Sequence, residues 1–106
     1  MANLLTHRRY NQTVSLTTSI NTTPAIDFSV FEAGLITLPN GSTITDMDFY
    51  VCSSESGTYI YMPGADLTSL AAERAYQLSD KLVGAQYIKI VANAAGSAEI
   101  MFQGFR

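Results

Sequence analysis

The histidine and carboxylates of this chain are the residues that could perform acid–base chemistry, and their placement argues against it. A hydrolytic triad uses a histidine as its base, and the single histidine, His7, lies near the N-terminus. A general base must be held in position, so a terminal histidine is interpreted as a solvated side chain. Asp46 and Asp48 share one face of a predicted strand and could pair, but no partner residues accompany them. The sequence therefore predicts that this chain is not an enzyme.

Cofactor sites are equally hard to find in the sequence. One cysteine, Cys52, excludes an intramolecular disulfide and a cysteine-based zinc site, and is expected to be a small packing residue within a strand. The glycines at 34, 41, 57 and 64 stand singly in turn contexts, so no phosphate-binding loop is present. We predict no metal and no cofactor.

Three tyrosines are candidate ligand or interface residues. Tyr59 and Tyr61 share one face of a predicted strand, and Tyr50 lies on a neighbouring one. Exposed tyrosines can stack on sugar rings or anchor a protein interface through large, rigid area. Cross-strand packing pairs are the alternative interpretation.

The N-terminal segment is the second candidate interface. All nine acidic residues lie from Asp27 onward, whereas Arg8 and Arg9 are two of the six lysines and arginines. A basic segment on an acidic body is suited to docking on an acidic partner. Residues 1–12 are interpreted as an arm or an edge strand, with Leu5, Arg8, Arg9 and Tyr10 as its partner-binding residues. The acidic remainder disfavours nucleic-acid binding.

Short runs of alternating apolar and polar residues dominate the elements that must position these side chains. Successive strand residues point to opposite faces, so period-two alternation indicates strands with one buried face. Such runs occupy 13–20, 26–32, 35–38, 44–53, 58–62, 87–92 and 98–105. Two pairs of these runs are expected to form hairpins, 44–53 with 58–62 and 87–92 with 98–105. Pro39-Asn40-Gly41 is a strong turn signal.

The pattern predicts an all-β fold, a single antiparallel β-sandwich of seven or eight strands, jelly-roll-like, with an extended N-terminal arm. Residues 67–78 are ambiguous because helical spacing and alternation both fit; a strand over 71–78 is our prediction, and a helix is the alternative. The predicted core contains the inward residues of the strands, namely Val14, Leu16, Ile20, Phe28, Val30, Leu38, Met47, Phe49, Val51, Ile60, Ile88, Ile90, Ile100 and Phe102.

Length and hydropathy are consistent with one soluble domain. The chain has 106 residues, which fits an arm over 1–12 and one sandwich over 13–106. No apolar run is long enough to span a bilayer, and residues 1–10 contain no signal-peptide core. We expect synthesis in the cytoplasm and no membrane partner.

From Gly41 onward the sequence resembles a known class of proteins. The stretches that carry the resemblance are Gly41-Ser42-Thr43-Ile44-Thr45, Phe49-Tyr50-Val51, Ser56-Gly57-Thr58-Tyr59, residues 74–78 (RAYQL) and residues 84–91 (GAQYIKIV). Together they resemble small β-sandwich head decoration, or cement, proteins of tailed bacteriophages. Residues 85–91 are also similar to a late core strand of discoidin-like and galactose-binding-like jelly rolls. The resemblance covers about two-thirds of the chain and carries over no catalytic residue.

The resemblance implies a virion structural protein on the capsid surface of a phage, made in the host cytoplasm. Its expected partners are the major capsid protein or other virion proteins, and a homo-oligomer, with a trimer favoured. The alternative is a carbohydrate-binding module or a receptor-binding virion component that uses Tyr50, Tyr59 and Tyr61 to bind a glycan.

Overall fold

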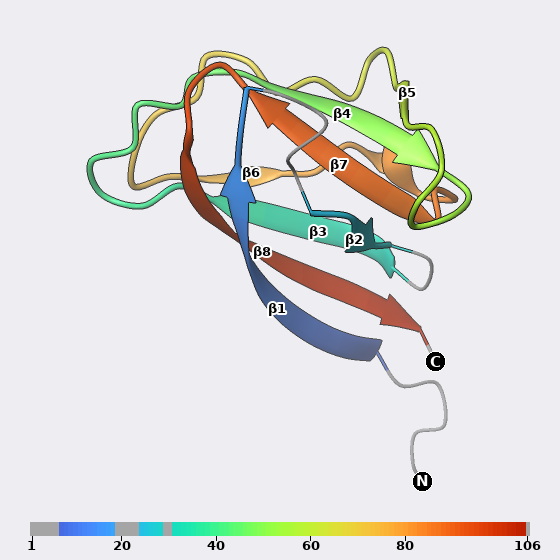
Figure 1. Cartoon of the computed structure of the whole chain (residues 1–106). Helices are drawn as coiled ribbons and strands as arrows, with labels where there is room; N and C mark the ends of the chain where they lie inside the picture. Colours follow the sequence, from blue (N-terminus) through green and yellow to red (C-terminus); the bar gives the residue numbers. More distant parts are fainter. Residues whose placement is uncertain (1–6, 19–23, 29–30, 106) are drawn as a thin grey trace, which may run out of the picture.

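In a computed structural model the chain forms a two-layered β-sandwich, and the structure describes residues 7–18, 24–28 and 31–105. Figure 1 shows the two antiparallel sheets facing each other. Eight strands are described: β1 (His7–Leu16), β2 (Ile26–Asp27), β3 (Phe31–Thr37), β4 (Met47–Cys52), β5 (Ile60–Tyr61), β6 (Ala75–Gln77), β7 (Tyr87–Ala92) and β8 (Gly96–Phe105). A short 3₁₀ helix, η1 (Asp80–Leu82), precedes β7.

The strand order identifies the sandwich as a jelly roll. The first sheet has the order β1-β8-β3-β6 and the second has the order β2-β7-β4-β5. Every described pairing between these strands is antiparallel. An eight-stranded double sheet of this kind is the jelly-roll arrangement found in capsid and lectin domains, so the predicted fold class is confirmed.

The core lies between the inner faces of the two sheets. Along β7 the side chains alternate strictly between partly exposed and buried, as the sequence pattern predicts. The rings of Phe28 and Phe102 bridge the layers edge to face, with centroids 5.4 Å apart. Buried residues from the predicted core are Val14, Leu16, Phe28, Leu38, Met47, Phe49, Ile88, Ile90, Ile100 and Phe102, and Val51 packs against them half-buried.

The remaining three predicted core residues have other outcomes. The prediction that Ile60 is buried is wrong, because its side chain is 67% exposed on β5, at the edge of the second sheet. A two-residue edge strand has only one neighbour, so an inward register does not cover its side chain. Ile20 and Val30 lie outside the described residues.

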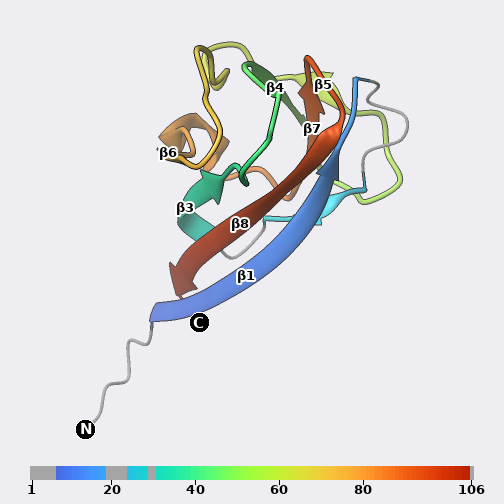
Figure 2. The same ribbon diagram turned by 90° about the vertical axis from the view of Figure 1, so that its left-hand side faces the viewer.

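The last two strands do not form the predicted hairpin. β7 belongs to the second sheet, between β2 and β4, whereas β8 belongs to the first sheet, between β1 and β3. Figure 2 shows β8 running beside β1 on the far side of the sandwich from β4. Each strand has one apolar face, and these faces pack against each other across the core instead of lying side by side.

The ambiguous segment 67–78 is extended, and the helix alternative is wrong. Its only regular element is β6, which pairs with β3. Ser69 and Glu73 both have positive φ angles, which are incompatible with a continuing right-handed helix. Backbone hydrogen bonds from Leu70 to Thr45 and from Leu78 to Gly34 fix the segment along its neighbours. Tertiary pairing thus overrides the helical propensity of its residues.

Glycine is required at two positions for different reasons. Gly41 has a φ of +84° in the turn where the Ser42 amide donates to the Pro39 carbonyl, as the Pro-Asn-Gly signal predicts. The sequence analysis placed Gly34 in a turn context, and this is wrong, because Gly34 lies inside β3 opposite Phe102. A Cβ at Gly34 would lie 2.9 Å from Leu78 Cδ1. The glycine permits close packing there.

Candidate functional site

The described part of the N-terminal basic segment lies in an edge strand. Residues 7–12 of the predicted arm form the first part of β1, whose backbone pairs with β8 from His7–Phe105 to Leu16–Gly96. Arg8, Arg9 and Tyr10 lie opposite Gly104, Gln103 and Phe102 in this register. Leu5 lies outside the described residues. β1 ends the order of the first sheet, so within the described chain its outer edge is free to accept another strand.

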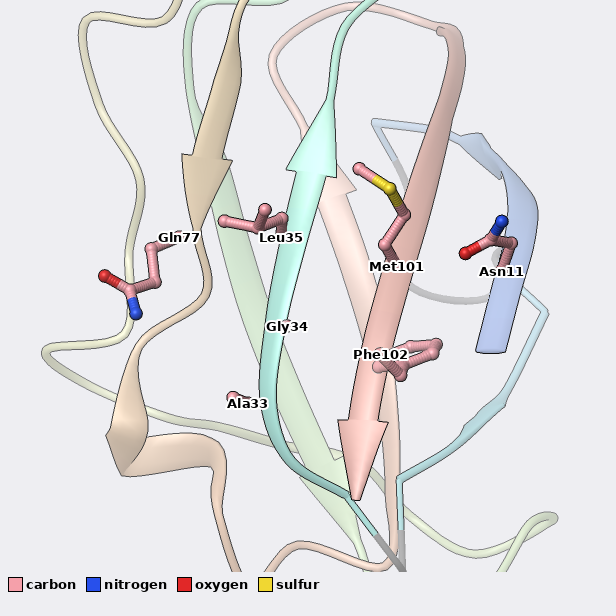
Figure 3. A pocket seen from close by; sticks show the side chains of 7 residues that line it. All are labelled: Asn11, Ala33, Gly34, Leu35, Gln77, Met101 and Phe102. Atoms are coloured by element: carbon pink, nitrogen blue, oxygen red, sulfur yellow. The ribbon is translucent and has the colours of Figure 1, made fainter. Parts of the chain in front are cut away.

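A shallow groove crosses the outer face of the first sheet. Its centre is one cross-strand row formed by Asn11 on β1, Met101 on β8, Leu35 on β3 and Gln77 on β6. Figure 3 shows Leu35 and Met101 side by side between Asn11 and Gln77. The groove has a volume of about 640 Å³, and its lining is completed by Ala33, Gly34 and Phe102.

The groove is apolar at its centre and uncharged along its row. Leu35 is 41% exposed, which is unusual for a leucine on the solvent face of a sheet, and Met101 is half-buried beside it. The flanking residues Ile36 and Ile100 point into the core, so alternation places Leu35 and Met101 outward. Exposed apolar patches rimmed by polar residues mark interaction surfaces. The sequence analysis did not single out this groove, although two large apolar residues at outward positions were the available signal.

Two of the three candidate tyrosines are brought together. Tyr50 on β4 and Tyr61 on β5 are cross-strand partners, with ring centroids 5.6 Å apart and planes tilted by 56°. The Tyr61 hydroxyl donates to Asp66 Oδ2 at 2.5 Å. Asp66 is held beside the strands because its neighbour Leu67 exchanges two backbone hydrogen bonds with Met47.

Tyr59 does not join the Tyr50–Tyr61 pair. Its side chain is buried, its hydroxyl donates to the Glu55 carbonyl at 2.8 Å, and the Lys89 ammonium lies 4.6 Å from its ring centroid. Burial is the main reason that the pKa of Tyr59 is raised. Tyr59 therefore anchors its own loop, and the three tyrosines do not form one continuous platform.

Carboxylates gather next to the exposed tyrosine pair. Asp48 precedes Tyr50 by two residues on the same face of β4. Its pKa is raised by partial burial and by the negative charges of Asp66 and Asp46. Tyr50, Tyr61, Asp48 and Asp66 are called the tyrosine–aspartate cluster below. Among the described residues no group of three or more histidine, cysteine or acidic side chains is arranged to hold a metal ion.

The Tyr61–Asp66 hydrogen bond makes a testable prediction about pH. Together with partial desolvation and the charges of Asp66 and Asp48, it raises the pKa of Tyr61 from 10.0 to about 12. A folded pKa above the unfolded one means that the bond contributes to stability below pH 10 and is lost as the pH rises toward 12. In a tyrosinate absorbance titration, the ionisation of Tyr61 is expected near pH 12. Asp66→Asn should move this ionisation to lower pH, and Tyr61→Phe should remove it. If the ionisation of Tyr61 occurred at the same pH in Asp66→Asn as in the wild type, the hydrogen bond to Asp66 would not be the cause of the raised pKa.

The structure also places the remaining residues that the sequence analysis considered for chemistry. Cys52 is a free, half-buried cysteine, consistent with the packing residue expected from the sequence. Asp46 accepts a hydrogen bond from the hydroxyl of Thr45. The backbone of His7 begins β1. In the part of the chain that the structure describes, no helix has the length and apolar character needed to cross a membrane.

Comparisons with known proteins identify a similar fold and no matching family. No protein-family model matches the chain, and no curated protein matches it in sequence. Among solved structures, the fold is similar to that of the SPBc2 prophage-derived protein YomS, with a TM-score of 0.60 and 10% sequence identity. The similarity covers 98% of this chain and 100% of that chain. At this identity the likeness shows the fold alone.

Proposed function

We propose that this chain is a non-enzymatic structural protein of a tailed-phage virion, a decoration or cement protein on the capsid surface. It stabilises the shell by binding neighbouring capsid subunits. The observation that carries this proposal is the groove beside the edge strand β1. An exposed leucine and a methionine lie in a neutral row that crosses all four strands of one sheet. A row of this kind supports a role in binding another protein.

The edge of β1 gives this surface a second means of attachment. A free strand edge offers backbone N–H and C=O groups to an added strand, and the adjacent groove offers apolar contact to its side chains. Arg8 and Arg9, at the start of β1, would add charge-assisted hydrogen bonds to acidic groups of a bound partner. Many equivalent sites on a shell would convert a weak contact into substantial particle stability.

Two further observations support a phage origin. YomS is described as prophage-derived, and this chain shares its fold along nearly its whole length. The sequence stretches from Gly41 onward resemble phage decoration proteins, and jelly rolls are common in viral capsids. A domain of 106 residues is also small enough to bind in many copies on the surface of a shell.

The decisive measurement is co-sedimentation of the purified protein with undecorated shells of its source phage. The wild type is expected to bind. The double variant Leu35→Glu, Met101→Glu should lose at least about 90% of binding, because two charges would be desolvated in the groove. Deletion of residues 1–6, which leaves β1 whole, should weaken shell binding less than the double variant does.

Val83→Glu is the matched control for this experiment. Val83 is also a large exposed apolar residue, at 47%, but it follows η1 and does not line the groove. It is expected to bind shells like the wild type. Equal loss in the control and the groove variant would show that added negative charge is responsible and not the groove. No binding by the full-length wild type would overturn the proposed function.

A further inference from the structure

The tyrosine–aspartate cluster has the chemistry of a receptor for an organic cation. Tyr50 and Tyr61 present two tilted rings, and the electron-rich face of a tyrosine ring attracts ammonium and guanidinium groups. Asp66 and Asp48 supply carboxylates beside these rings, and the pKa of Asp48 is raised first by partial burial and then by the negative charges of Asp66 and Asp46. A bound cation would relieve the repulsion among these charges.

The same face already contains one contact of this type. The Lys89 ammonium lies over the Tyr59 ring, so the protein's own cation occupies the neighbouring tyrosine. Lys89 pairs in register with Tyr50 and is nevertheless directed toward Tyr59. Asp66 is held by the Tyr61 hydrogen bond and by the backbone bridge at Leu67, so contacts within the chain already organise the cluster.

The basic residues of the chain indicate which cation fits. Arg8 and Arg9 are adjacent in a segment that contains no acidic residue before Asp27. They lie at the start of β1 in the first sheet, whereas the cluster lies on the outer face of the second sheet. Both views show the start of β1 at the opposite end of the molecule from β5 (Figures 1 and 2). The two regions of one chain therefore cannot meet.

We propose that the tyrosine–aspartate cluster of one copy binds an arginine from the N-terminal basic segment of a second copy. This inference rests on the proposed function and names a partner for its basic segment. Arginine suits the site better than lysine, because its planar guanidinium can stack on a ring while donating to a carboxylate. A contact between two different surfaces is heterologous, so repeated copies close into a ring, such as a trimer, or continue as a chain.

The direct test adds a synthetic peptide of residues 1–12 to the full chain carrying Arg8→Gln and Arg9→Gln, whose own segment cannot compete. Tyrosine ring NMR signals are followed and assigned with Tyr50→Phe and Tyr61→Phe. The wild-type peptide is expected to shift the signals of Tyr50 and Tyr61. The same peptide with both arginines replaced by glutamine should bind at least about tenfold more weakly.

Asp48→Asn and Asp66→Asn in the receptor should each weaken binding of the arginine peptide by a similar factor, since these isosteric changes keep the shape of the site. Equal binding of both peptides would overturn the proposal, as would undiminished binding in both asparagine variants. If a panel of monosaccharides shifts the two tyrosines and the arginine peptide does not, the cluster is a saccharide site and the proposal is wrong.

Charge exchange tests the same contact in the full chain. Arg8→Glu with Arg9→Glu should lower the sedimentation mass at high concentration, and so should Asp48→Lys with Asp66→Lys. A mixture of these two variants should regain association, because each then supplies the charge that the other lost. Failure of the mixture to associate would count against the contact. Shell co-sedimentation is measured separately, so shell binding without self-association removes this inference alone, and self-association without shell binding removes the proposed function alone.

Discussion

The variant Phe49→Ala is expected to lose about 3–5 kcal/mol of unfolding free energy, which is a large share of the stability of a small domain. Phe49 is completely buried at the centre of β4, and its carbonyl also accepts the amide of Met62. Removing the ring leaves a cavity between the two sheets that the surrounding strands cannot fill. Urea unfolding followed by circular dichroism measures the loss.

Ile60→Ala is the matched control, because the alternation pattern places Ile60 in the core and the structure does not. Its side chain is 67% exposed, so the change in unfolding free energy should stay within about 0.5 kcal/mol. A loss from Ile60→Ala comparable with that from Phe49→Ala would show that β5 packs in the opposite register. The comparison thus tests the edge of the second sheet, where Tyr61 is positioned.

The second large effect is expected from Gly34→Val, which should destabilise the fold by about 1–3 kcal/mol through overpacking. The new Cβ would lie 2.9 Å from Leu78 Cδ1 and 3.3 Å from the Met101 carbonyl oxygen. The carbonyl belongs to the β8 backbone and cannot move without disturbing the β3–β8 pairing. Because Leu35 and Met101 are positioned by that pairing, shell binding should fall together with stability.

Ala33→Val provides the comparison for this prediction, since Ala33 precedes Gly34 on β3 and is exposed. The same residue is introduced one position away on the other face of the strand, where valine is a favourable strand residue. Thermal unfolding should show little change in Ala33→Val and a clear decrease in Gly34→Val. Equal thermal unfolding midpoints for both variants would mean that Leu78 and β8 shift to accommodate the added methyl groups without loss of stability.

The two candidate surfaces lie on opposite sheets of the sandwich. The groove and the β1 edge belong to the first sheet, and the tyrosine–aspartate cluster belongs to the second. In the two proposals above, the groove of the first sheet contacts the shell, and the tyrosine–aspartate cluster of the second sheet receives the basic segment of a neighbouring copy. The core between the layers holds the two surfaces at a fixed separation.

The sequence by itself determined the fold class and most of the core. Strict alternation along 87–92 and the apolar positions of 98–105 require strands with one buried face, because side chains point alternately to each side of a strand. The Pro39–Gly41 turn was also predictable from local sequence, because proline fixes its own φ angle and glycine readily adopts a positive one. Tyr50 and Tyr61 could be placed on neighbouring strands because a short polar loop joins those strands.

Only the tertiary structure decided which strands are neighbours, and with them the candidate surfaces. Alternation says that a strand has a buried face but not whether that face meets the next strand beside it or across the core, so the expected pairing of β7 with β8 was wrong. The row from Asn11 to Gln77 joins four strands from distant parts of the sequence. Asp66 meets Tyr61 through a loop held by long-range hydrogen bonds at Leu67. Local patterns contain no such distances, because these contacts form only when the whole chain has packed.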